Sequence, residues 1–421
     1  MIRGAYSLLM RAAQPLLRRK LRRRGSAEPG YLEAVEERFG HYPAPTEPGR
    51  LWIHAVSLGE TRAAAILIEA LRRHQPGLRF LLTHGTATGR AEGAQLLQPG
   101  DTQAWLPWDT PPAVDAFLAQ FRPCAGVLME TELWPNLVAG CQARGVPLAL
   151  ANARLSEKSL RQAQRIAVLS RPAYAALSAV WAQTAADARR LADAGARVDG
   201  VFGNLKFDAR PEPALLAQGR AWREQAERPV IMFASSREGE EAALLRLLLE
   251  SPSGDGAAVQ WLLVPRHPQR FDEVAALAAG AGFVVARRSG WPASGPPAGQ
   301  ALWLGDSLGE MPLYYGLAAV ALLGGSFEPL GGQNLIEAAA CGCPVIMGPH
   351  TFNFSEAAEQ ALASGAALRV DSMEEGLRQA LALAADPQRH ARMAQAATHF
   401  AAAHRGAAER TAQALLARLR S

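Results

Sequence analysis

The sequence predicts an α/β protein made of two doubly wound, Rossmann-like domains with a cleft between them. Three observations predict this fold class. Short apolar runs alternate with Ala- and Leu-rich helical stretches. The alternation stops once near the middle of the chain and then resumes. Polar side chains follow most of the apolar runs, where a parallel sheet presents the ends of its strands to a ligand.

The first series of expected strands occupies the N-terminal half of the chain. It comprises LWIHAV (51–56), RFLLTH (79–84), AGVLME (125–130), VPLALAN (146–152) and AVWAQT (179–184). Helical stretches between strands are typical of βαβ units, so the sheet should be parallel. Residues 207–213 then contain two prolines and three charges, a composition that favours a linker.

The second series follows the linker. It comprises PVIMFAS (229–235), VQWLLVP (259–265), GFVVAR (282–287), AAVALLGG (318–325) and PVIMG (344–348). A Gly/Pro-rich stretch at 288–299 is interpreted as a surface loop, and Ala-rich helices close the chain from Met373 onward. The expected boundaries are a basic segment at 1–25, a first domain at 26–206, a linker at 207–215 and a second domain at 216–421.

Composition narrows the function classes. The chain has 421 residues, of which 49% are hydrophobic and 20% charged, as expected for globular domains with buried cores. Its four cysteines fit neither a disulfide framework nor a zinc site, which favours a reducing compartment. Eight positive charges and no acid lie in residues 1–24, and without them the formal net charge of +5 becomes −3. We therefore expect no nucleic-acid partner.

The basic N-terminal segment indicates a membrane surface. Its charge-free runs, 4–10 and 12–17, are far shorter than the roughly 20 residues that a spanning helix needs. No cleavage site follows, so a secretory signal is not favoured. We expect a helix that lies in the membrane interface, with its arginines on anionic headgroups and four leucines in lipid: Leu8, Leu9, Leu16 and Leu17. A solvated basic arm is the alternative.

Three candidate features lie in the N-terminal half of the chain. Ser57 and Glu60 have the spacing of a capping box, in which both side chains satisfy amides at a helix start. The alternative is that Glu60 acts as a general base at the edge of the cleft. Lys206 is one of only three lysines against 41 arginines, which hints at a need for a compact ammonium group, with chance as the alternative. Glu130 ends an expected strand, and Glu132 follows it, before a helix that Pro135 begins. The alternative is that one of these two acids merely caps that helix.

Two further motifs lie in the second series. Gly331 and Gly332 directly precede an Ala-rich helix, so their amides could hold a phosphate while Glu337 accepts from ribose hydroxyls. A plain helix start is the alternative. Arg266 and His267 follow a strand and offer two donors to a phosphate or base, although such pairs are commonly surface features.

Several patterns are missing from the sequence. There is no P-loop and no complete G-x-G-x-x-G, so an ordinary dinucleotide fold is not supported. No Asp-x-Asp occurs, and that motif is the usual metal clamp for a nucleotide-sugar diphosphate. The histidines show no metal-ligand spacing. We therefore expect neither a metal nor a resident cofactor.

Taken together, the motifs resemble the lipid A Kdo transferases, inverting GT-B glycosyltransferases of lipopolysaccharide synthesis. The resemblance extends from about residue 30 to residue 400. It rests on WIHAVSLGE (52–60), ETELWPN (130–136), NARLSEKS (152–159), GNLKFD (203–208), PRHPQRF (265–271), GEMPLYY (309–315), GGSFEPLGGQNLIEAAACGCPVIMGPH (324–350) and NF (353–354). The family differs in often having a more continuously apolar N-terminal anchor, which Arg11 interrupts here.

The resemblance implies a reaction and a set of site residues. It implies transfer of 3-deoxy-D-manno-oct-2-ulosonic acid (Kdo) from CMP-Kdo to lipid IVA at the cytoplasmic face of the inner membrane. The first domain would bind the acceptor, with Glu60 as catalytic base and Glu130 and Lys206 stabilising the transition state. The second domain would bind CMP through Arg266, His267, Gly309, Glu310, Met311, Asn334, Leu335, Ile336 and Glu337. The alternatives are a GT-B transferase that uses a UDP-sugar and an inactive membrane-attached nucleotide-sugar binder.

Overall fold

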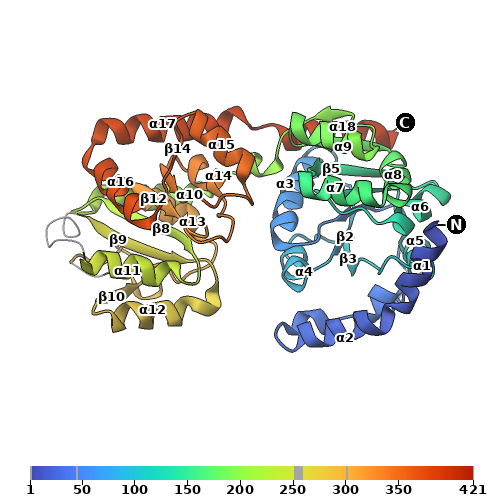
Figure 1. Cartoon of the computed structure of the whole chain (residues 1–421), viewed down its shortest axis with the longest axis horizontal. Helices are drawn as coiled ribbons and strands as arrows, with labels where there is room; N and C mark the ends of the chain where they lie inside the picture. The colour runs from blue at the N-terminus through green and yellow to red at the C-terminus, as the bar shows by residue number, and fades with distance from the viewer. Residues whose placement is uncertain (1, 44–45, 251–258, 300–301, 421) are drawn as a thin grey trace. The chain divides into compact units, whose positions relative to one another are not determined.

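The computed structural model describes residues 2–43, 46–250, 259–299 and 302–420, and it divides into two compact units (Figure 1). The first unit comprises Met1–Asp208 together with Arg405–Ser421, and the second comprises Ala209–His404. Each unit is built on its own seven-stranded parallel sheet with helices on both faces. The predicted fold class is therefore confirmed as two doubly wound α/β domains.

The first sheet has the strand order β3-β2-β1-β4-β5-β6-β7. Its strands are β1 (Leu51–His54), β2 (Phe80–His84), β3 (Thr102–Trp105), β4 (Ala125–Met129), β5 (Leu148–Ala153), β6 (Ala179–Ala182) and β7 (Gly200–Val201). All five strands predicted in this half are present, and β3 and β7 are additional. The direction of the order reverses between β1 and β4, so the topological switch point lies where these two strands end.

The first unit has helices on the faces of its sheet and others, such as α1 and α2, that pack on helices and turns. They are α1 (Ile2–Ala12), α2 (Gln14–Gly25), α3 (Leu58–His74), α4 (Ala87–Ala94), α5 (Pro111–Phe121), α6 (Pro135–Ala143), α7 (Glu157–Arg165), α8 (Ala167–Ala175), α9 (Ala185–Ala194) and α18 (Ala407–Arg420), with 3-10 turns η1 (Pro29–Leu32), η2 (Val35–Phe39) and η3 (Leu205–Asp208). Successive residues of β1 point to opposite faces: Trp52 packs with Phe117 of α5, and Ile53 packs with Leu67 of α3. This alternation gives the sheet a core on each side.

The last helix corrects the predicted domain boundary. The sequence placed residues up to 421 in the second domain, whereas α18 belongs to the first unit and packs on α3. In Figure 1 it is the red helix that lies with the blue and green elements. Ala412, Leu415 and Leu416 complete the core on that face of the sheet, and the Asp208 carboxylate accepts a hydrogen bond from the Ala408 amide (2.6 Å). The C-terminal helix α18 therefore packs in the first unit because its apolar face completes the core of that unit.

The second sheet has the order β10-β11-β9-β8-β12-β13-β14. Its strands are β8 (Val230–Ser236), β9 (Gln260–Pro265), β10 (Val285–Arg287), β11 (Leu302–Leu304), β12 (Val320–Leu323), β13 (Val345–Met347) and β14 (Ala367–Arg369). The predicted five are again present, with β11 and β14 in addition. The helices are α10 (Pro213–Gln225), α11 (Glu240–Glu250), α12 (Phe271–Gly280), α13 (Met311–Leu317), α14 (Leu335–Ala340), α15 (Ser355–Ala363), α16 (Met373–Ala385) and α17 (Pro387–Ala403), with η5 (Pro268–Arg270) and η6 (Arg288–Gly290).

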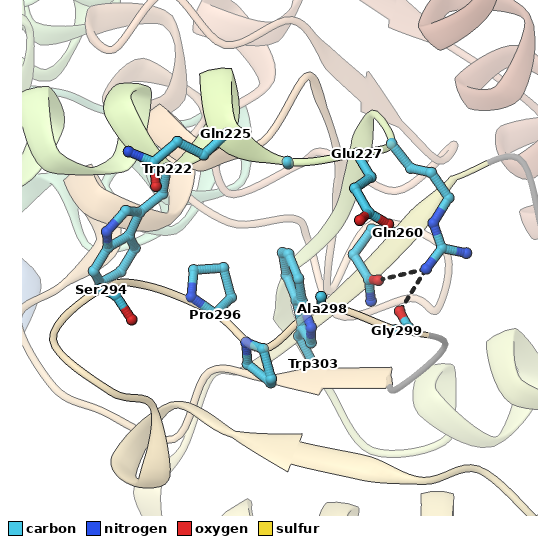
Figure 2. A pocket seen from close by; sticks show the side chains of 12 residues that line it. Trp222, Gln225, Glu227, Gln260, Ser294, Pro296, Ala298, Gly299 and Trp303 are labelled. Atoms are coloured by element: carbon cyan, nitrogen blue, oxygen red, sulfur yellow. Dashed lines mark hydrogen bonds between the residues drawn. The ribbon is translucent and has the colours of Figure 1, made fainter.

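The Gly/Pro-rich stretch 288–299 is more than the surface loop that the sequence predicted. Trp291 within it is buried, with its ring 5.4 Å from that of Trp303 and 6.0 Å from that of Trp222. Pro296, with Trp222 and Trp303, also lines a pocket of about 160 Å³ (Figure 2). Burial of its tryptophan against two other tryptophans favours the inward path of the stretch.

The N-terminal arm is helical, and its environment differs from the prediction in two places. Among the described residues, no helix is long and apolar enough to span a bilayer. Leu8, Leu9 and Leu16 are 66–69% exposed, as an interfacial helix requires. Leu17, however, is half-buried, and the Arg18 guanidinium binds the Glu36 carboxylate instead of projecting freely from the arm. Two residues of α2 that were expected to contact lipid, Leu17 and Arg18, therefore contact the protein instead.

Candidate active site

The capping-box geometry predicted for Ser57 and Glu60 is present where β1 leads into α3. Ser57 is the N-cap, and its hydroxyl oxygen accepts a hydrogen bond from the Glu60 amide (3.4 Å). Glu60 reaches back with its own carboxylate, which accepts from the Val56 amide (2.7 Å) and from the Ser57 hydroxyl (3.2 Å). These contacts fix the Glu60 carboxylate beside the switch point of the first sheet.

The same carboxylate has a strongly shifted acidity. Burial raises the pKa of Glu60 to about 7, and the negative charges of Glu130 and Glu132 add to the rise. The hydrogen bonds from Val56 and Ser57 act in the opposite direction. A carboxyl group with a pKa near neutrality can take up a proton and release it again at physiological pH. Capping the helix and acting as a base are thus compatible functions of one side chain.

Glu130 lies directly after β4 and holds two cations. Its carboxylate is 3.4 Å from the Lys206 Nζ and 3.9 Å from a guanidinium nitrogen of Arg154, and the residue is only 9% exposed. Its φ of 60° is in the left-handed region, which is uncommon for a residue with a side chain. Such backbone strain gathers at functional sites. Arg154 directly follows the adjacent strand β5, and its ion pair with Glu130 was not predicted from the sequence.

Lys206 is placed by a loop that is tied to the neighbouring strand end. The Asn204 side chain accepts from the Lys206 amide (3.0 Å), and Asn152, at the end of β5, accepts from the Leu205 amide (3.0 Å). Asn152 is buried and also has a left-handed φ of 51°. The sequence placed Asn152 at a strand end, whereas its hold on the loop 53 residues later depends on the fold. The structure therefore brings Glu60, Glu130 and Lys206 together within the first unit, as predicted.

In the second unit, Arg266 and His267 follow β9, as predicted. The Arg266 Nε donates to the Gln333 side chain (3.2 Å), so the Arg-His pair is joined to the segment that leads into α14. The sequence did not single out Gln333. Burial lowers the pKa of His267, with the charges of Arg237 and Arg266 adding to the effect, so the imidazole is neutral at pH 7.

The segment from Gly309 to Met311 forms the turn into α13. Gly309 has a φ of 80°, which suits a residue without a Cβ. Glu310 accepts from Arg288 (2.8 Å) and from the Ser307 hydroxyl (2.5 Å), so its carboxylate is held within the turn. Met311 is the first residue of α13.

The segment that begins α14 divides into side chains that pack and side chains that face outward. The Asn334 side chain caps the helix by accepting from the Ile336 amide (3.2 Å). Leu335 and Ile336 are each 1% exposed, so their side chains are core residues and only their backbone could contact a ligand. Glu337 is partly exposed, and its charge contributes to raising the pKa of the buried Tyr315.

Several backbone amides of the glycine loops in this unit already donate hydrogen bonds to groups of the protein, which the sequence did not suggest. The Gly332 amide donates to the Gly325 carbonyl (2.7 Å), so it is not available to a phosphate. The amides of Gly325, Phe327 and Glu328 all donate to Glu240, a residue that the sequence did not single out. Among the described residues, no group of three His, Cys, Asp or Glu side chains could hold a metal ion.

Comparisons with known proteins indicate one family for this chain. The family described as "3-Deoxy-D-manno-octulosonic-acid transferase (kdotransferase)" matches residues 33–209. The 3-deoxy-D-manno-octulosonic acid transferase of Bordetella pertussis is 49% identical over 98% of both chains. That of Haemophilus influenzae is 32% identical over 97% of both chains.

Solved structures agree with the fold. A UDP-GlcNAc 2-epimerase from Neisseria meningitidis has a TM-score of 0.57 at 15% identity, covering 88% of this chain and all of that one. A glycosyltransferase from Rickettsia africae has a TM-score of 0.56 at 13% identity, covering 88% of this chain and 98% of that one. At these identities the likeness concerns the two-domain GT-B fold alone. The sequence relatives are far closer, and they show that the chain belongs to the 3-deoxy-D-manno-octulosonic acid transferases, a family of glycosyltransferases.

Proposed function

We propose that this protein transfers Kdo from CMP-Kdo to lipid IVA in lipopolysaccharide synthesis, with Glu60 as the general base. The observation that carries the proposal is the Glu60 carboxylate, which is fixed at the switch point of the first sheet with a pKa of about 7. A base must be deprotonated before the reaction and must hold the proton afterwards, and a pKa near the working pH serves both needs.

The proposed reaction is a single displacement. A glucosamine hydroxyl of the acceptor gives its proton to Glu60 while its oxygen bonds to the anomeric carbon of Kdo. The bond between that carbon and the phosphate oxygen breaks, the electron pair stays on the phosphate, and CMP leaves with the configuration at the anomeric carbon inverted. Glu60 returns its proton to water when the products depart.

Lys206 and Glu130 have separate tasks in this scheme. The ammonium group of Lys206 offsets negative charge that develops on the leaving phosphate. Glu130 holds that ammonium at 3.4 Å and balances the charge of Arg154, so the cation is in place before the donor binds. Preorganised charges of this kind stabilise a transition state without reorganisation during the reaction.

The second unit is proposed to bind CMP. Arg266 supplies a fixed cation for the single phosphate, and the neutral His267 supplies a hydrogen-bond donor beside it. Glu337, Asn334 and the turn at Gly309, Glu310 and Met311 are proposed to contact the nucleoside. A leaving group with one phosphate carries less charge than a diphosphate, which is consistent with a site that uses arginine in place of a metal.

The first unit is proposed to associate with the cytoplasmic face of the inner membrane. Ile2, Leu8 and Leu9 of α1 are exposed, and the arginines of α2 from Arg22 to Arg24 are also exposed. Apolar side chains and cations on one arm are suited to an interface with anionic lipid, where both contribute to binding. This placement would bring the active site to an acceptor that resides in the membrane.

One experiment tests the donor and the acceptor together. Purified full-length protein is incubated with CMP-Kdo and lipid IVA, and the lipid is analysed by mass spectrometry. We expect the mass to rise by one Kdo residue or by a multiple of it, and we expect CMP but not UDP to raise the melting temperature. Transfer from a UDP-sugar with no transfer from CMP-Kdo would overturn the donor assignment. The absence of any transfer with protein that CMP stabilises would instead point to an inactive binder.

A further inference from the structure

A buried carboxylate occupies a nest of backbone amides in the second unit. Glu240, the first residue of α11, is 1% exposed. One of its oxygens accepts from the amides of Gly325 (2.7 Å) and Arg237 (2.9 Å). The other accepts from the amides of Phe327 (3.2 Å) and Glu328 (3.4 Å). Four amides that converge on one anion form the arrangement that binds phosphate in many proteins.

Burial raises the pKa of the Glu240 carboxyl above its ordinary value, and the hydrogen bonds from the four amides oppose that rise. The neighbouring Glu241 binds Arg270 through an ion pair of 2.7 Å, whereas no arginine, lysine or histidine in the described part of the chain forms an ion pair with Glu240. An acid buried without a cation is rare, because burying a charge is costly unless it is paired or hydrogen-bonded. The four amides therefore treat Glu240 as they would treat a bound anion.

The nest adjoins the segments that are proposed to bind the donor. The Gly325 carbonyl accepts from the Gly332 amide (2.7 Å), and a Cβ on Gly325 would be 3.1 Å from the Gln333 side chain. Gln333 in turn accepts from Arg266. Glu240 is thus connected through Gly325 and Gln333 to Arg266. Arg266 is the cation that is proposed to hold the phosphate.

We propose that Glu240 determines donor specificity by occupying this amide nest with its own negative charge, which leaves room for one donor phosphate and repels a second. The inference rests on the proposed CMP site and adds the residue that limits the number of phosphates. The carboxylate also fixes the loop from Gly325 to Glu328, because one side chain binds three of its amides. A nucleoside diphosphate would have to bring further negative charge towards a carboxylate that cannot move away.

Glu240→Ala tests the nest without requiring a nucleotide. Removal of the side chain leaves four amides without an acceptor, and inorganic phosphate should bind them. In phosphate-free buffer we expect the variant to bind inorganic phosphate at least tenfold more tightly than the wild type, measured by calorimetry and by melting temperature. Glu238→Ala is the matched control, because it removes the same charge from an exposed side chain two residues away whose ion pairs, among the residues that the structure describes, are with Arg237 and Arg270. Equal phosphate affinity in the wild type, the control and Glu240→Ala would overturn the proposal.

The nucleotide preference supplies the second measurement. The wild type should bind CMP at least tenfold more tightly than CDP, and in Glu240→Ala this ratio should fall towards one. Glu240→Gln keeps the shape of the side chain and removes its charge. This variant should therefore reduce the preference for CMP over CDP even if the alanine variant does not fold. If neither variant folds unaided, phosphate should raise the refolding yield of Glu240→Ala and leave that of the wild type unchanged; no such gain would contradict the nest.

The two proposals can fail separately. A wild type that neither CMP nor CDP stabilises would refute the donor site, while the phosphate measurement on Glu240→Ala would still decide whether the nest binds anions. A wild type that binds CDP as tightly as CMP would refute the specificity role of Glu240 and leave the donor site intact.

Discussion

The Glu60 side chain caps helix α3 and is also the proposed catalytic base. The capping box holds one oxygen on the Val56 amide and the other within reach of the Ser57 hydroxyl, so the side-chain rotamer is fixed before any substrate arrives. Burial among other acids raises its pKa to about 7. The structural interpretation of this motif and the catalytic one were alternatives in the sequence. In the structure, the cap is the means by which the proposed base is positioned.

Glu60→Gln separates the two functions. An amide can still accept from the Val56 amide but cannot take up a proton, so we expect turnover to fall roughly a hundredfold or more while CMP-dependent stabilisation is unchanged. The measurements are initial rates and the melting temperature with and without CMP. Ser57→Ala is the counterpart: it should cost about 1 kcal/mol of stability through the lost cap and reduce turnover far less. A folded Glu60→Gln protein with near-normal turnover would leave the capping box as the only function of Glu60.

The acidity of Glu60 predicts a pH dependence. The base acts only when it is deprotonated, so kcat/KM should fall about tenfold for each pH unit below 7. Glu132 raises the pKa of Glu60 by its charge, so Glu132→Gln should move this acid limb to lower pH while the rate above pH 8 stays close to that of the wild type. A pH–rate profile of the two proteins checks the direction. An acid limb that stays in place or moves to higher pH would show that Glu60 does not control it.

Residues were predictable from the sequence where their chemistry is local. Glu60 and Ser57 are three residues apart in one helix turn, and Arg266 directly follows a strand, so pattern alone located them. Glu240 and Gln333 were missed because their partners, Gly325 and Arg266, are 85 and 67 residues away in the chain. Only the parallel order of the second sheet, which places β12 beside β8, brings such pairs together.

At the scale of elements, most of the predicted strands are buried on both faces, although the partly exposed β10 was predicted and the buried β11 was missed. β1, β4 and β8 are rich in apolar residues and almost wholly buried, and all three were predicted, whereas the edge strand β3 begins with the partly exposed Thr102 and Gln103. Length alone does not decide the outcome, because the three-residue strands β11 and β14 were missed while β10 and β13, which are equally short, were predicted. The chain end α18 was misplaced because amphipathic periodicity shows that a helix has an apolar face and does not show which sheet that face covers.

The return of α18 to the first unit can be tested at its cap. Asp208→Ala removes the carboxylate that accepts from the Ala408 and Gly406 amides and should cost about 1 kcal/mol of stability in the first unit. Hydrogen exchange should therefore accelerate in α18 and α3. Asp386→Ala is the matched control, because Asp386 caps α17 in the second unit through the amides of Gln388 and Arg389. Faster exchange in the second unit alone after Asp208→Ala would contradict this assignment.

At the scale of the whole molecule, the proposed chemistry is divided between the two units as the sequence predicted. Glu60, Glu130 and Lys206 lie in the first unit, and Arg266 and Glu337 lie in the second. The charge is divided as well: the eight positive charges of residues 1–24 lie on α1 and α2 of the first unit. The arm carries cations beside exposed leucines, so it should bind an anionic lipid surface through both charge attraction and apolar burial. It should bind a neutral lipid surface through apolar burial alone.

Vesicle binding tests this arm without removing it. Deletion of residues 1–24 would also remove the buried Leu21 and the hydrogen bond from Ser7 to Asn136, so substitution of the exposed Leu8 and Leu9 is the cleaner change. Full-length wild type should sediment with anionic vesicles, be partly released by high salt, and bind neutral vesicles more weakly, since salt screens the charges and leaves the apolar contribution.

The double variant Leu8→Asp/Leu9→Asp should lose most of its sedimentation with both kinds of vesicle, because it places two carboxylates where apolar side chains would meet lipid. Its activity on a detergent-dispersed acceptor should persist, since no residue of the proposed active site lies before Glu60. Val284→Asp, at a side chain that is 74% exposed in the second unit, adds the same type of charge outside the arm sequence and should sediment like the wild type. If the double variant binds vesicles as well as Val284→Asp does, the membrane contact lies outside α1, and the exposed Val168 at the start of α8 becomes the next position to substitute.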